Sequence, residues 1–142
     1  MGHDSAESAE SAYYQAFMQG DQEALMSVWL MDEAIECIHP FGPRLTGYKA
    51  VYSSWQEVLQ QSRGMTIELQ HCLRVESDDL AVHTLLEIMS WEHEEEGEET
   101  AEINTTNVYR KTDEGWFMIA HHASPAPSLE LLAGQSNNFD LH

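Results

Sequence analysis

The side chain best suited to proton transfer in this 142-residue sequence is histidine, and His39 is the first candidate. It opens the segment His39-Pro40-Phe41-Gly42, in which the proline and the glycine predict a turn after a short strand. An imidazole titrates near neutral pH, so it can exchange a proton with a carbon acid or a bound water. His39 is therefore a candidate catalytic base; the alternative is a ring that hydrogen-bonds the following turn and holds its shape.

Two adjacent histidines, His121 and His122, lie in a predicted strand, where successive side chains point to opposite faces. Only one of them can therefore face a cavity. If a hairpin pairs Lys111 with Trp116, one face of the two strands carries Asn107, Tyr109, His122 and Ser124, and the other carries Thr106, Val108, Ile119 and His121. We predict that the first set lines the cavity, with His122 as a candidate catalytic residue; a slip or bulge of one residue would exchange the two sets.

Two more side chains could contact a ligand. Tyr14 is a candidate phenol donor, or it packs in the core with Phe17 and Met18, which share its helical spacing. Arg44, one of six basic residues, lies near the predicted cavity mouth. There it could bind a ligand carboxylate or pair with a carboxylate of the protein.

Trp29 and Trp55 fall on apolar stripes, and we expect them to form core or cavity wall in contact with a ligand. Cys37 and His39 are two residues apart in a predicted strand, about 6.6 Å along the chain, which disfavours a Cys/His dyad. No spaced histidine or cysteine pattern supports a zinc site. We therefore expect neither a metal nor a cofactor.

The elements that position these side chains follow from the hydrophobic periodicity. It predicts helices over Ala9–Gln19, from Asp21 to Trp29 and from Thr46 to near Gly64, with a short strand at Ala34–Ile38. Alternation then predicts four long strands, in the first of which one parity is shared by Met65, Ile67, Leu69, Leu73 and Val75. The other three run over Leu80–His93, Thr100–Lys111 and Trp116–Ser124, and the charged segment Glu92–Glu99 is predicted to be a solvated connection. This order indicates the α+β class: a curved antiparallel sheet wrapped as a cone around three N-terminal helices.

The charge balance limits the partners. With 25 acidic and 6 basic residues the formal net charge is −19 and the pI is near 4.4. A phosphate backbone or an anionic membrane surface needs clustered Lys and Arg, so we expect no nucleic-acid and no membrane partner. No apolar run approaches the roughly 20 residues that a bilayer requires. We therefore expect a cytoplasmic protein.

Several segments together resemble the SnoaL-like branch, related to polyketide cyclases and ketosteroid isomerases, of the nuclear transport factor 2-like (cystatin-like) superfamily. They are Gly20-Asp21 before the Trp29 helix, the turn His39 to Gly47, the Trp55 helix, Thr106 to Arg110, and Trp116 leading to His121-His122-Ala123-Ser124-Pro125. The resemblance implies a homodimer formed through the outer face of the sheet. In ketosteroid isomerases an aspartate base lies at the place that His39 occupies here, and an acid or tyrosine stabilises an enolate oxygen. The strand from Asn104 to Arg110 offers no such acid.

The resemblance covers residues 9–126, and we treat 1–8 as a flexible lead and 127–142 as a C-terminal tail. It implies a protein that binds a small apolar ligand, and if it is an enzyme, a cofactor-independent isomerase, cyclase or dehydratase that acts by proton transfer. The alternative is an interaction or assembly module that works through its outer sheet, because this scaffold carries both kinds of protein. The identity of the ligand is left open.

Overall fold

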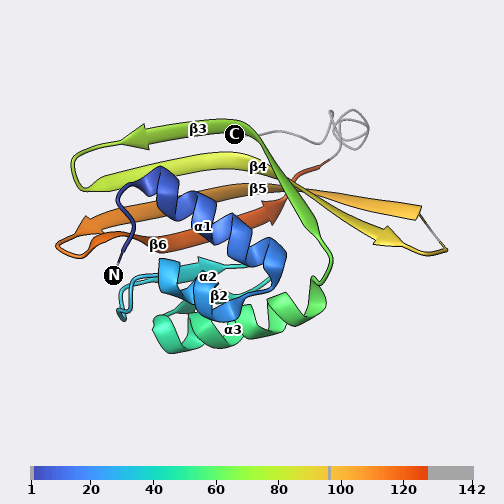
Figure 1. Cartoon of the computed structure of the whole chain (residues 1–142), viewed down its shortest axis with the longest axis horizontal. Helices are drawn as coiled ribbons and strands as arrows, with labels where there is room; N and C mark the ends of the chain where they lie inside the picture. Colours follow the sequence, from blue (N-terminus) through green and yellow to red (C-terminus); the bar gives the residue numbers. More distant parts are fainter. Residues whose placement is uncertain (1, 96, 128–142) are drawn as a thin grey trace, which may run out of the picture.

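The structure, a computed structural model, describes residues 2–95 and 97–127 (Figure 1). The described residues contain three helices: α1 (Ala6–Gln19), α2 (Gln22–Val28) and, after two short strands, α3 (Tyr48–Gln61). The hydroxyl of Ser5 accepts a hydrogen bond from Ser8 N at 3.0 Å, so α1 begins three residues before the predicted start. Gly20 ends α1 in the left-handed conformation, with φ of 68°, as a helix end requires.

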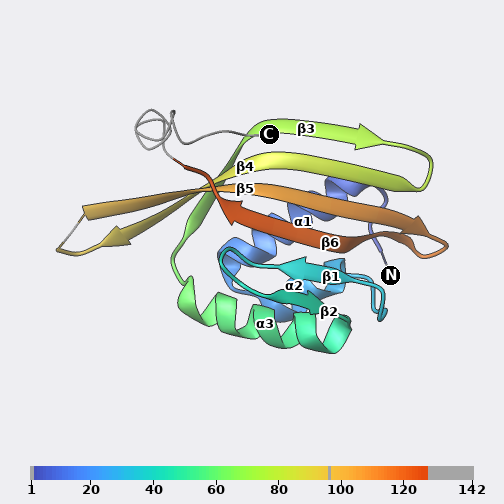
Figure 2. The ribbon, with the colours of Figure 1, turned by 180° about the vertical axis from the view of Figure 1, so that it is seen from behind.

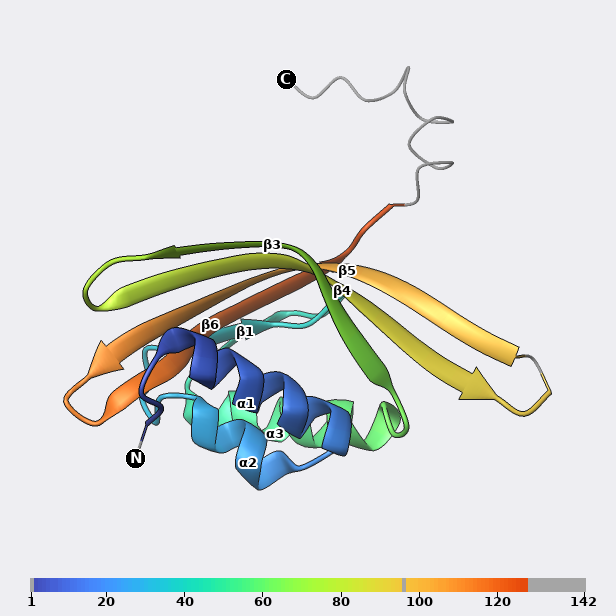
Figure 3. The ribbon, with the colours of Figure 1, turned by 45° about the horizontal axis from the view of Figure 1, so that its top comes forward.

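Within residues 2–95 and 97–127, six strands form one sheet in the order β2-β1-β6-β5-β4-β3. The four long strands, β3 (Thr66–Glu76), β4 (Leu80–His93), β5 (Gly97–Thr112) and β6 (Gly115–Pro125), are antiparallel neighbours. The short strands β1 (Glu36–Ile38) and β2 (Arg44–Thr46) extend the sheet, and β1 pairs with β6 in parallel, which the sequence analysis did not anticipate. The helices cover the concave face of the curved sheet (Figures 2 and 3). The predicted α+β cone is confirmed.

A β-bulge in each of two long strands decides which side chains enter the cone. In β6, Tyr109 pairs with Met118 as predicted, but Val108 pairs with Ala120, so Ile119 is the extra residue. In β3 the register shifts between Gln70 and Leu73, around His71 with its positive φ of 53°. Beyond each bulge the side chains exchange faces.

The bulge in β3 corrects one sequence expectation. Ile67 and Leu69 pack against the core, whereas Leu73 and Val75 are 62% and 61% exposed although they share their parity. A single inserted residue reverses the alternation for the rest of the strand.

The charged segment Glu92–Glu99 is paired rather than a loop. β4 continues to His93 and β5 begins at Gly97, with Glu92 opposite Glu98 and Trp91 opposite Glu99. This end of the hairpin extends beyond the body of the sheet (Figure 3). The prediction of a solvated connection is therefore wrong about its conformation, while the glutamates described there are exposed as expected.

The two ends of the chain differ in what the structure describes. Near the N-terminus, His3 pairs with Trp116 in an antiparallel bridge, so part of the predicted lead is tied to the sheet. The predicted C-terminal tail 127–142, with its leucines at 129, 131 and 132, lies outside the described residues apart from Pro127. None of the helices in the described ranges is long and apolar enough to cross a membrane.

Candidate functional site

A cavity of about 320 Å³ lies inside the cone, between the first and third helices and the sheet. Its walls are mainly aromatic and aliphatic, from Phe17, Trp55, Val58, Met65, Met89 and Trp91. Three titratable side chains reach it from three different strands or turns: His39 after β1, Glu87 on β4 and His121 on β6. No lysine or arginine lines it within the described chain.

Behind the cavity wall, four buried side chains form one continuous hydrogen-bond chain. The Tyr14 hydroxyl donates to Glu87 Oε2 at 2.6 Å and accepts from Asn107 Nδ2 at 2.9 Å. The Oδ1 atom of Asn107 lies 2.6 Å from Nδ1 of His121. The chain therefore connects α1, β4, β5 and β6, and it joins two of the titratable groups that face the cavity.

Burial sets the charge of both groups. It raises the pKa of Glu87 to about 7, and the hydrogen bond from Tyr14 opposes that rise by favouring the carboxylate. Burial also lowers the pKa of His121 to about 3, with the neighbouring histidines as smaller causes. At neutral pH, Glu87 is poised between its two protonation states and His121 is an uncharged ring.

His39 lies beside His121, with ring centroids 6.2 Å apart, and edge-on to Trp55, with ring centroids 4.7 Å apart. Its Nε2 lies 2.9 Å from the Ser54 hydroxyl of α3, so the ring is held by a helix and not by the following turn. Burial lowers its pKa, which keeps the ring neutral near pH 7. At neutral pH His39 is therefore an uncharged imidazole on the cavity wall.

Cys37 comes closer to His39 than the strand spacing predicted, with Sγ 3.6 Å from Nε2. The reason is that β1 ends at Ile38, so His39 lies in the turn and its ring can bend back. Burial raises the pKa of the Cys37 thiol to about 12, so no thiolate nucleophile forms at neutral pH. The two side chains are therefore closer than expected. A Cys/His dyad is still disfavoured, because the thiol stays protonated at neutral pH.

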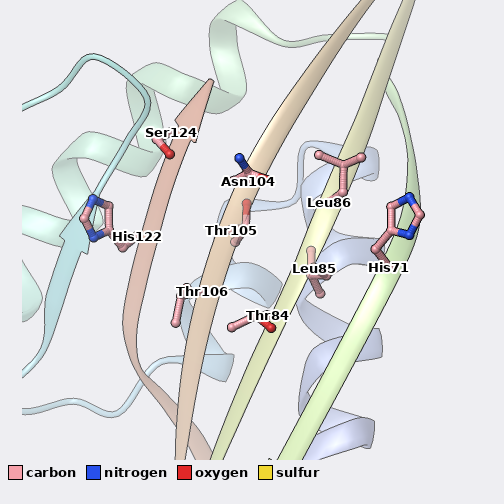
Figure 4. A pocket seen from close by; sticks show the side chains of 9 residues that line it. All are labelled: His71, Thr84, Leu85, Leu86, Asn104, Thr105, Thr106, His122 and Ser124. Carbon is pink, nitrogen blue, oxygen red and sulfur yellow. The ribbon is translucent and has the colours of Figure 1, made fainter. Parts of the chain in front are cut away.

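His122 and Ser124 are on the opposite side of the sheet from the cavity, so their predicted placement is wrong. The bulge at Ile119 sets His121 opposite Asn107 and turns His122 outward, opposite Thr106. Figure 4 shows His122 and Ser124 with Asn104 and Thr106 around a shallow hollow on the outer face.

The other predicted residues divide between core, cavity and surface. Trp55 lines the cavity, and Tyr14 reaches its wall through Glu87. Tyr109 faces inward as predicted but packs against His83, and Trp29 is buried beside Met118, away from the cavity. Arg44 is exposed and pairs with Glu36 at 2.9 Å, the protein-carboxylate alternative for this residue.

The sequence analysis missed Glu87. It searched for an acid on the strand from Asn104 to Arg110, whereas the acid lies on the neighbouring strand. Glu87 shares parity with Ala81, Leu85 and Met89, so a carboxylate on the apolar face of a strand was the available signal. Within the described residues no cluster of three or more His, Cys, Asp or Glu side chains is placed to hold a metal ion.

A second buried glutamate lies beside this chain. Glu10, one helical turn before Tyr14, bonds Nη2 of Arg74 at 2.6 Å and Nδ1 of His83 at 2.9 Å. His83 is likewise four residues before Glu87 on β4. The helix and the strand thus make two neighbouring contacts, each with a buried glutamate, and neither Glu10 nor His83 lines the cavity.

A family model described as the SnoaL-like domain matches residues 7–128, nearly the whole of this fold. The chain belongs to the SnoaL-like family. A crystal structure of a candidate dehydratase of the nuclear transport factor 2-like family from Streptomyces avermitilis is 27% identical to it. The match covers 86% of this chain and 94% of that one, with a TM-score of 0.78.

Other relatives of this SnoaL-like chain have different names. A candidate calcium/calmodulin-dependent protein kinase type II association domain from Thiobacillus denitrificans is 30% identical, with a TM-score of 0.78 and coverage of 89% of this chain and 99% of that one. The F-box protein SKIP8 of Arabidopsis thaliana is 26% identical over 103 residues, which are 72% of this chain. The match spans only 41% of the length of that plant protein. The fold is therefore shared by proteins with unlike roles.

Proposed function

We propose that this SnoaL-like protein binds a small apolar molecule in the cone and moves a proton on it, as a cofactor-independent isomerase or dehydratase. The observation that carries the proposal is Glu87, a 1% exposed carboxyl with a pKa of about 7 on the same cavity as the neutral His39. Two titratable groups whose environments separate their protonation states are the usual signature of an acid and a base. The resemblance to a candidate dehydratase supports the same reading.

The roles follow from the two protonation states. Neutral His39 takes a proton from a carbon beside a carbonyl group, and the electron pair of that C–H bond moves to the carbonyl oxygen as an enolate. Protonated Glu87 donates a hydrogen bond to that oxygen. Return of the proton from His39 to another carbon completes an isomerisation. In a dehydration, the same proton leaves with a β-hydroxyl group as water.

The test is solvent exchange at carbon. Acetophenone, whose methyl hydrogens can form an enolate, is incubated with the protein in deuterated water and followed by proton NMR. We expect the protein to accelerate deuterium incorporation, and we expect His39→Ala and Glu87→Gln each to remove at least nine tenths of the acceleration. Arg44→Ala, outside the cavity, is the control. Equal rates in all four proteins, or no acceleration by any, would refute the proton-transfer role.

We also propose that the protein forms a homodimer through the outer face of the sheet. This face carries Leu73 and Val75, both more than 60% exposed, where an isolated domain would present an apolar patch to water. The relative named as an association domain supports an assembly role of this kind as the second candidate function. Sedimentation would decide: Leu73→Lys with Val75→Lys should convert a dimer to a monomer, and a monomeric parent would rule the dimer out.

A further inference from the structure

The hydrogen-bond chain behind the cavity fixes the direction of each of its bonds. The Tyr14 hydroxyl donates to Oε2 of Glu87, which accepts whether Glu87 is ionised or carries its proton on Oε1. Tyr14 can then accept from Asn107 only through the amide nitrogen. The amide oxygen of Asn107 therefore faces His121, and it must accept a hydrogen bond from Nδ1–H of that ring. His121 is thus the tautomer with hydrogen on Nδ1, and the lone pair is on Nε2.

The lone pair of His121 has no partner in the described protein. All of the ring's hydrogen bonds there run through Nδ1, to Asn107 and more weakly to Tyr13 at 3.4 Å. The fully enclosed polar side-chain atoms that lack a partner are on Trp29, Trp55, Thr105 and Tyr109, so Nε2 is not sealed inside the core. Because His121 lines the cavity, this nitrogen is open to a ligand. At Nε2 the neutral His121 ring therefore offers a ligand a hydrogen-bond acceptor and no donor.

The second histidine is fixed in the same manner by a different residue. The Ser54 hydroxyl donates its only hydrogen to the Val51 carbonyl at 2.8 Å. It must therefore accept from Nε2–H of His39, which leaves Nδ1 of His39 as the unprotonated nitrogen. The two rings are locked in opposite tautomers, and each keeps one lone pair available.

We propose that His121 accepts a hydrogen bond from a hydroxyl group of the ligand. The substrate of this site is then a neutral carbonyl compound that also carries a hydroxyl group. This inference rests on the proposed function and names its substrate class. The carbonyl oxygen lies at Glu87 and the acidic C–H bond at His39, while the hydroxyl hydrogen is donated to Nε2 of His121. A ligand carboxylate or phosphate is disfavoured, because no basic side chain of the described protein lines the cavity to neutralise it.

The experiment compares binding within one set of probes. These are 3- and 4-hydroxyacetophenone, the two methoxy analogues, which keep the oxygen but lose the donor, and acetophenone itself. Dissociation constants are measured by ligand-observed NMR or calorimetry, which need no turnover. We expect one hydroxy isomer to bind about tenfold more tightly than its methoxy analogue. Equal affinities, or tighter binding of 4-(aminomethyl)acetophenone as a cation, would overturn the proposal.

Two variants assign the preference to His121. His121→Phe keeps a ring and should bind the hydroxy and methoxy probes equally. Asn107→Asp, the second variant, places a carboxylate on Nδ1 and stabilises the doubly protonated ring, so Nε2 becomes a donor and the hydroxyl preference should again disappear. A preference that survives in both folded variants would contradict the assignment. The nitrogen-15 shifts of His121 in the parent give an independent check, since they must report hydrogen on Nδ1 alone.

The two proposals can fail separately. Deuterium exchange without a hydroxyl preference would leave the proton-transfer function and remove the substrate class. A hydroxyl preference without exchange would leave the binding specificity and remove the reaction.

Discussion

Two glutamates are buried between α1 and the sheet, Glu10 on the helix and Glu87 on β4, and they differ in what neutralises them. Glu10 has Arg74 and His83 within hydrogen-bond distance. Among the described residues no cation lies within hydrogen-bond distance of Glu87; the Tyr14 hydroxyl donates to it, and it faces a cavity. A buried carboxylate without a counter-charge costs stability, and such costs are found at functional sites. We therefore infer a structural role for Glu10, which is paired, and a functional role for Glu87, which is not.

Removing the paired glutamate should have the largest effect on stability. Glu10→Ala leaves the partly exposed Arg74 guanidinium and the buried His83 without their acceptor. Because Arg74 is partly exposed, we take the low end of the cost of breaking a buried pair, about 3 kcal/mol. We expect a loss of that order in the free energy of unfolding, measured with urea. Gln15→Ala, at an exposed position on the same helix, should change stability by less than about 0.5 kcal/mol. A loss no larger than that of the control would show that the Glu10 contacts are not structural.

The unpaired glutamate should behave in the opposite way. The pKa of Glu87 is about 7 in the folded protein against an ordinary value of 4.5, so the fold binds this proton more tightly than the unfolded chain. The contribution of Glu87 to the free energy of unfolding is therefore greatest at low pH, and it is lost as the pH rises from 4.5 to 7. Glu87→Gln has no such pH dependence at this position. We expect Glu87→Gln to be more stable than the parent by up to roughly 3 kcal/mol at about pH 8, with the gap closing as the pH falls toward the ordinary glutamate pKa.

Urea unfolding of both proteins at a series of pH values measures this gap. A Glu87→Gln variant that is less stable than the parent at mildly alkaline pH would mean that the carboxylate stabilises the fold, as Glu10 does. That outcome would erase the difference between the two glutamates.

Removing the Tyr14 hydroxyl should have a smaller effect, on the pKa of Glu87. Tyr14→Phe removes the hydrogen bond that favours the carboxylate, so the pKa of Glu87 should rise further, by about one pH unit. The carbon-13 resonance of the side-chain carboxyl reports it. Tyr52→Phe is the matched control, because Tyr52 also donates to a glutamate, Glu23, but at the surface. If the pKa of Glu87 does not change in Tyr14→Phe, the hydrogen bond from Tyr14 does not help to set that pKa.

The fold could be predicted from the sequence because each element carries its own local signal. Apolar spacing gave the three helices, and the Asp21 cap and Gly20 end of the first pair are where they were expected. The hairpin turn was also local, so Lys111 pairs with Trp116 as predicted. These features depend on a few neighbouring residues and need no knowledge of the rest of the chain.

The site was only partly predictable, because bulges depend on the curvature of the whole sheet. On β5, which has no extra residue, Asn107 and Tyr109 face inward as expected. On β6, the extra Ile119 exchanges His121 for His122. The residues around Ile119 do not predict that it will be left unpaired in a bulge. Sequence alternation therefore placed one strand correctly and the other in reverse.

Glu87 is a buried carboxyl without a counter-charge among the described residues. Its protonation can be measured directly, as the carbon-13 chemical shift of the Glu87 carboxyl over roughly pH 3 to 9, assigned by its absence from the Glu87→Gln spectrum. We expect a titration centred at about pH 7, well above that of the exposed glutamates. A midpoint near the ordinary value of 4.5 would contradict it.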